Sequence, residues 1–138
     1  MTVPSSPVPS FVPTKGLQDG VQLQKMADQL YDSASGITAQ ADTTKANATR
    51  LSAVHNLIET VAGAADSVML PKGYVGLEIT IANDGANSCQ VFGNGSDTIN
   101  DVATETGVAQ ANALTALYRC YAYDRATDVA RWFRILSA

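Results

Sequence analysis

Residues 77–92 read LEITIANDGANSCQVF, and this stretch decides the fold class. Its first part alternates apolar and polar residues, which is typical of a strand with one buried face. The NDGAN of residues 83–87 consists of turn-forming residues, and CQVF at 89–92 resumes an apolar strand. The residues expected to face the core are Leu77, Ile79 and Ile81. Two strands around such a turn predict a β-hairpin.

The sequence on both sides continues in the same manner. Residues 93–97 form another turn before the short strand 98–100, and runs at 114–123 and 129–136 predict a second hairpin. The aromatic residues expected to fill the core of that hairpin are Tyr118, Tyr121, Tyr123, Trp132 and Phe133. Residues 50–61 also fit helical spacing, but their Thr and Val content favours a strand. Residues 36–138 are therefore expected to form a β-sandwich or jelly-roll-like barrel, without an internal repeat.

Residues 1–16, MTVPSSPVPSFVPTKG, differ from the rest in composition. The four prolines fix φ and remove backbone donors, so an extended arm is expected. A disordered tail is the ordinary alternative at a terminus. The arm also has apolar residues that a solvated linker does not need, and they predict docking on a neighbouring subunit. These anchors are Val3, Val8, Phe11 and Val12.

Residues 17–35 predict one short amphipathic helix, running from about residue 20 to 33. Asp19 is placed to cap its start, and Gly36 follows its end, where a left-handed glycine commonly closes a helix. Leu23, Met26 and Leu30 recur at the spacing of one helical face. A helix of this length needs a partner surface, which is either its own β-domain or a symmetry mate.

The composition narrows the function. The net charge is −4 and the basic residues are scattered, which argues against nucleic acid as a partner. Charged residues make up only 16% of the chain, and a weakly charged surface is cheap to bury against a neighbour. We expect neither a secretory signal nor a membrane span. Cys89 and Cys120 are expected to be buried thiols. A disulfide between them is an alternative only if their strands are neighbours.

The residue types that carry chemistry are sparse. His55 is the only histidine and lies in no nucleophile motif, so we expect a surface or core role and no catalytic residues. The segment Asn94-Gly95-Ser96-Asp97, with Asn100 and Asp101, could offer oxygen ligands to calcium, but it matches no calcium-loop pattern, and the acidic residues suit turns. We expect no bound metal and no cofactor. Tyr74 is the one aromatic residue expected to be exposed, which is thin support for a carbohydrate site.

One set of segments resembles virion proteins of tailed bacteriophages. The resemblance covers residues 36–138 and rests on an ADSV-x-LP run at 65–71, a GAN turn at 85–87, a DTIN run at 97–100 and the aromatic C-terminal strand. It implies a non-enzymatic structural protein, most like a small head decoration or cement protein. Such a protein would be made in the bacterial cytoplasm and would sit on the capsid exterior as a homotrimer bound to the major capsid protein. A tail or fibre module that recognises host glycans is the alternative.

Overall fold

The computed structural model describes residues 32–137 of the chain, and these form a mainly β domain with two mixed sheets. The predicted arm, and the predicted helix up to residue 31, lie outside the described residues. One short 3₁₀ helix, η2 (Lys45–Asn47), precedes β2. The strands are β1 (Ser33–Thr38), β2 (Thr49–Arg50), β3 (His55–Thr60), β4 (Asp66–Met69), β5 (Glu78–Asn83), β6 (Cys89–Phe92), β7 (Thr98–Ile99), β8 (Val108–Gln110), β9 (Leu114–Asp124) and β10 (Val129–Leu136).

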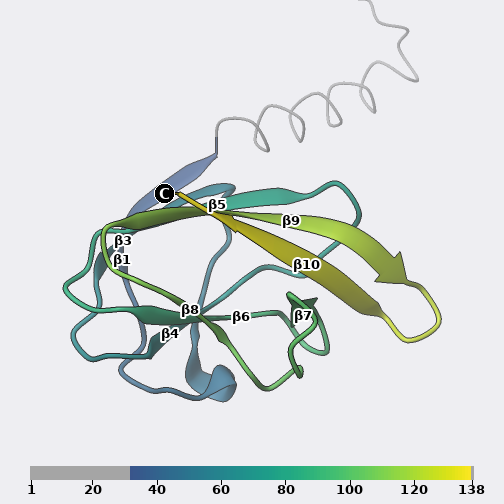
Figure 1. Cartoon of the computed structure of the whole chain (residues 1–138), viewed down its shortest axis with the longest axis horizontal. Helices are drawn as coiled ribbons and strands as arrows, with labels where there is room; N and C mark the ends of the chain where they lie inside the picture. Colours follow the sequence, from purple (N-terminus) through teal and green to yellow (C-terminus); the bar gives the residue numbers. More distant parts are fainter. Residues whose placement is uncertain (1–31, 138) are drawn as a thin grey trace, which may run out of the picture. The chain divides into compact units, whose positions relative to one another are not determined.

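The chain changes sheet at almost every strand. Strands β1, β3, β5, β9, β10 and β7 form one sheet in that order, and β2, β4, β6 and β8 form the other. Figure 1 shows the sheets as two layers, with β5, β9 and β10 in one and β4, β6 and β8 in the other. The first six strands therefore wind as a spiral, because β1, β3 and β5 pair in parallel, as do β2, β4 and β6. Parallel pairs of this kind distinguish the fold from an antiparallel jelly roll.

The main hydrophobic core includes residues of both sheets, and a second, smaller cluster is formed by Ala48, Met69 and Phe92. Strand β5 alternates between half-buried and buried residues, and Ile79 and Ile81 on its inner face are almost completely buried, as predicted. The same core includes Val68 and Val91 from the four-stranded sheet. Burying an aliphatic side chain of this size contributes about 1.5–3 kcal/mol, so the alternation in each strand decides which face turns inward.

The predicted hairpin at 77–92 is wrong. Both strands exist, but β5 belongs to the six-stranded sheet and β6 to the four-stranded sheet, so the NDGAN segment crosses between layers. Asn83 directs the crossing, since its amide donates to the carbonyls of Asn87 and Gln110 and its Oδ1 accepts from the Gly85 N–H. Turn-forming residues specify a reversal of the chain, but they do not specify which strand receives it.

The C-terminal hairpin is confirmed as β9 and β10, an antiparallel pair with a bulge at Arg131–Trp132. Fewer aromatic side chains of this hairpin lie in the core than predicted. Trp132 and Tyr118 are completely buried, whereas Tyr121 and Tyr123 are exposed. The strand assignment within 50–61 is confirmed by β3, and the short strand at 98–100 by β7.

The predicted boundary between helix and β-domain, at residues 35 and 36, lies inside a strand. Strand β1 begins at Ser33, and the compact β unit begins at the same residue. Gly36 does have the left-handed conformation, with φ of 69°, but inside β1 and not at a helix end. Its N–H donates to Glu59 Oε2 at 2.7 Å, a bond that fixes this kink in the edge strand.

Candidate functional site

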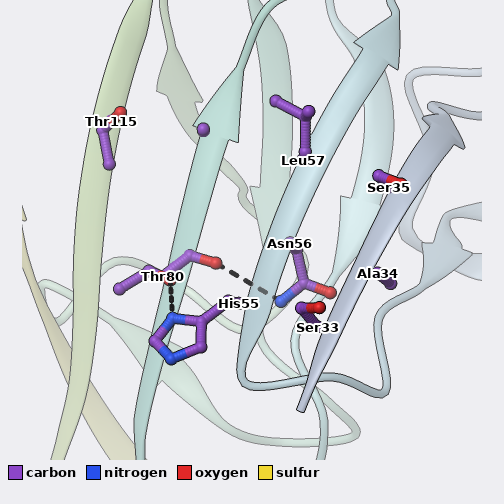
Figure 2. A pocket seen from close by; sticks show the side chains of 9 residues that line it. Ser33, Ala34, Ser35, His55, Asn56, Leu57, Thr80 and Thr115 are labelled. Atoms are coloured by element: carbon purple, nitrogen blue, oxygen red, sulfur yellow. Dashed lines mark hydrogen bonds between the residues drawn. The ribbon is translucent and has the colours of Figure 1, made fainter. Parts of the chain in front are cut away.

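A groove of about 250 Å³ lies on the outer face of the six-stranded sheet, across β1, β3, β5 and β9. The alternation of each strand sends its large aliphatic side chains into the core and leaves the outward positions to form the groove. Figure 2 shows these residues on four adjacent strands. The groove is lined by Ser33, Ser35, His55, Leu57, Thr80, Ala82 and Thr115, among others.

Two polar side chains of this groove, His55 and Asn56, make hydrogen bonds to Thr80. His55 Nδ1 lies 2.7 Å from Thr80 Oγ1, and the Asn56 amide donates to the carbonyls of Ala53 and Thr80 (Figure 2). Asn56 Oδ1 is buried without a hydrogen-bond partner among the described residues. Among the described residues that line the groove, none is an Asp, a Glu or a Cys.

Asp97, the sharpest metal candidate in the sequence, has a structural role. Its carboxylate is completely buried and accepts from Lys72 Nζ at 2.6 Å and from the N–H groups of Gly73 and Ala130 at 2.9 Å. Burial alone would lower the pKa of Lys72, but the hydrogen bond and the charge of Asp97 raise it above its ordinary value. Asp97 therefore joins the loop before β5 to the start of β10.

Two further residues of this candidate, Asn100 and Asp101, also have partners. Asp101 forms a two-point ion pair with Arg131, and Asn100 Oδ1 accepts from the N–H of Arg134. Within residues 32–137, no group of three or more His, Cys, Asp or Glu side chains is placed to hold a metal ion.

The outer surface of the β9–β10 hairpin has a strip of aromatic and arginine side chains. The rings of Tyr121 and Phe133 meet edge to face at 5.7 Å. The Arg119 guanidinium lies 5.5 Å from the Tyr121 ring, and that of Arg131 lies 5.6 Å from the Phe133 ring. Glu78 pairs with Arg119 at 2.8 Å, so the strip is held in place at this end. We call the four side chains of this surface the aromatic–arginine strip: Arg119, Tyr121, Arg131 and Phe133.

Sequence reasoning missed this strip because it assigned both aromatic residues to the core. Tyr74 is exposed as predicted, but it is not the one exposed aromatic residue, since Tyr121 is 53% exposed. The alternation of residues in β9 could have predicted the strip. Tyr118 and Cys120 face inward, and therefore Arg119 and Tyr121 face outward. The bulge near Trp132 then brings Phe133 beside them.

The two cysteines are buried free thiols, which confirms the expected burial. Cys89 lies in β6 and Cys120 in β9, strands of different sheets. Burial raises the pKa of the Cys89 thiol to about 11, so this sulfur stays protonated and unreactive at neutral pH.

The assembly contacts predicted from the sequence are not among the groups described above. They are Val3, Val8, Phe11, Val12, Leu23, Met26 and Leu30, and all of them lie outside the described residues.

In the part of the chain that the structure describes, no helix is long and apolar enough to cross a membrane. Comparisons of the chain with models of protein families, with curated proteins and with solved structures found no match.

Proposed function

We infer that this chain is a non-enzymatic structural protein of a tailed-bacteriophage particle, a decoration protein that stabilises the assembled capsid. Its β-domain would be a sandwich that sits on the capsid exterior as a homotrimer. Its N-terminal arm would dock on the next subunit. The resemblance of residues 36–138 to virion proteins supports a role in a phage particle. The exposed apolar side chains of the β-domain support contacts with neighbouring molecules.

The observation that carries the proposal is the amount of large apolar side chain left at that surface. A large apolar side chain at a surface gains free energy when another molecule covers it. Residues of this kind occur in the loop before β5 and on both strands of the C-terminal hairpin. They are Tyr74, Val75, Tyr121, Tyr123, Ile135 and Leu136.

The mechanism is binding energy without chemistry. A protein that binds only the assembled lattice stabilises that lattice by mass action. Cyclic symmetry lets each arm reach the next subunit, and such head-to-tail contacts close into a ring. In this arrangement Val3, Val8, Phe11 and Val12 anchor the arm on the neighbour. The capsid surface then meets a trimer whose three copies act together.

The number of copies per particle tests this proposal. Quantitative mass spectrometry of purified particles, with the major capsid protein as the internal standard, should give hundreds of copies. A handful of copies would contradict a capsid decoration protein and favour a tail component.

The aromatic–arginine strip supports a second candidate, a tail or fibre module that binds host glycans. Tyr121 offers an exposed ring, and Arg119 and Glu78 offer hydrogen-bonding groups beside it. Saturation-transfer NMR with a panel of bacterial surface oligosaccharides tests this candidate. Signal that is lost in Tyr121→Ala and kept in Tyr74→Ala would support it, and absence of signal with the whole panel would exclude it for that panel.

A further inference from the structure

A pocket of about 310 Å³ lies beside β2, at one edge of the four-stranded sheet. We propose that this pocket binds a single oxyanion, which is a phosphate or a carboxylate group. The inference does not rest on the proposed function. The pocket is lined by Lys45, Ala46, Arg50, Met69, Gly95 and Glu105.

The charge of Lys45 is buried in the wall of this pocket and is only partly compensated. Lys45 is the first residue of η2 and is 7% exposed. Its Nζ donates to the carbonyls of Gly95 and Thr104. Because an ammonium group has three N–H donors, one of them has no hydrogen-bond acceptor among the described residues.

The carboxylate beside Lys45 compensates this charge weakly. Glu105 Oε1 lies 3.8 Å from Lys45 Nζ, which is beyond hydrogen-bond distance, and the Glu105 side chain is 79% exposed. A buried charge is costly unless it is closely paired and hydrogen-bonded. An oxyanion in the pocket would supply the acceptor that the third N–H of Lys45 lacks.

Arg50 brings a second cation to the same pocket. It lies in β2 opposite Met69 of β4, and its Nη1 contacts the Met69 sulfur at 3.8 Å, although a thioether is a weak acceptor. Within residues 32–137, Arg50 forms no ion pair, whereas Arg119 and Arg131 of the aromatic–arginine strip are both paired with carboxylates. The Arg50 guanidinium therefore has donors available for a ligand.

The charges and donors of the pocket select the class of ligand. Two cations and one carboxylate line it, so it is locally positive in a chain with a net charge of −4. Lysine and arginine together form strong, charge-assisted hydrogen bonds with carboxylate and phosphate oxygens. A volume of about 310 Å³ is at the low end for small-molecule sites, which suits one such group.

NMR titration of the full-length, ¹⁵N-labelled chain tests the proposal. Sodium phosphate and sodium acetate are added in separate titrations, with sodium chloride keeping the ionic strength constant. We expect the backbone amide signals of Ala46, Gly95 and Glu105 to shift and to saturate with at least one of the two anions. Saturation with phosphate alone would identify a phosphate site, and saturation with acetate alone would identify a carboxylate site. Shifts that do not saturate with either anion would overturn the proposal.

A pair of matched arginine variants locates the binding. Arg50→Gln should raise the Kd of the saturating anion about tenfold, because it removes a charged donor. Arg125→Gln removes the same charge from an exposed position in the β9–β10 turn and should change the Kd less than about twofold. Equal effects of the two variants would show that the anion responds only to net charge, and would overturn the pocket as its site.

Glu105→Gln gives a result of the opposite sign. Because Glu105 is the carboxylate that competes for Lys45, its removal should lower the Kd about threefold. Its side chain is largely exposed, so we expect this variant to keep the fold, and its amide spectrum checks this expectation. Weaker or unchanged binding in Glu105→Gln would contradict an oxyanion beside Lys45.

Discussion

At the scale of single residues, the buried Asp97 carboxylate accepts hydrogen bonds from three different residues, Lys72, Gly73 and Ala130. Replacing it by alanine leaves the Gly73 and Ala130 N–H groups without their acceptor and Lys72 without its buried partner. We expect Asp97→Ala to lower the free energy of unfolding by about 3 kcal/mol, measured by urea titration. Asp84→Ala, at an exposed turn position, is the control and should change it by less than about 0.5 kcal/mol. A loss below about 1 kcal/mol for Asp97→Ala would contradict this structural role.

The buried thiol of Cys89 makes the free energy of unfolding of the domain fall at alkaline pH. Its folded pKa is raised to about 11 by burial, whereas the thiol of an unfolded chain ionises near pH 9. Because the folded state keeps the proton, the contribution of Cys89 is complete below pH 9 and is lost as the pH rises towards 11. Urea titrations between pH 8 and 11 should show a smaller fall in stability for Cys89→Ala than for the unmodified chain. Identical slopes would contradict the burial of this thiol.

At the scale of elements, the crossing from β5 to β6 depends on Gly85. A Cβ at this position would lie 2.6 Å from Val61 Cγ2 and 2.7 Å from the Val61 backbone nitrogen. A flexible side-chain end could move away, but the backbone cannot do so cheaply. We therefore expect Gly85→Ala to cost about 2 kcal/mol in thermal or urea unfolding. Ala86→Ser, one residue along and exposed, is the matched control and should be close to neutral.

Gln110 links the two sheets through hydrogen bonds. Its amide donates to the carbonyls of Ile81 and Leu114, and its Oε1 accepts from Tyr118 Oη at 2.8 Å; the bonds to Ile81 and Tyr118 are buried and the bond to Leu114 is partly buried. Tyr118→Phe should therefore cost about 1–2 kcal/mol, since it leaves Oε1 without a donor. Tyr123→Phe removes an exposed hydroxyl bond to Asp128 and should cost less than about 0.5 kcal/mol. Equal effects of the two variants would show that the buried bond does not hold the sheets together.

At the scale of the whole molecule, the sequence predicted which residues form strands better than how the strands pair. Alternation in β5 identified Ile79 and Ile81 as core residues, because it is a property of a single strand. Pairing depends on contacts between distant segments, so the parallel spiral of β1, β3 and β5 left no local pattern. The groove has no local signature for the same reason, because Leu57, Ala82 and Thr115 become neighbours only when the three strands β3, β5 and β9 assemble.

The last prediction concerns the N-terminal arm, which we expect to affect attachment to the particle and not folding. Among residues 32–137, the core consists of residues from 39 to 132 and the first strand begins at Ser33, so we expect that deleting residues 1–14 leaves the unfolding midpoint unchanged. If the arm docks on a neighbouring subunit, the same deletion should lower occupancy on particles about tenfold at a fixed concentration, since each 1.4 kcal/mol of lost contact is a factor of ten. Mass spectrometry of sedimented particles measures this occupancy.

A full-length variant with serine at the four anchors, Val3, Val8, Phe11 and Val12, separates lost apolar contact from lost length and should behave as the deletion does. Full occupancy of the deletion variant would show that the β-domain alone attaches the protein, and the arm would then have no part in assembly.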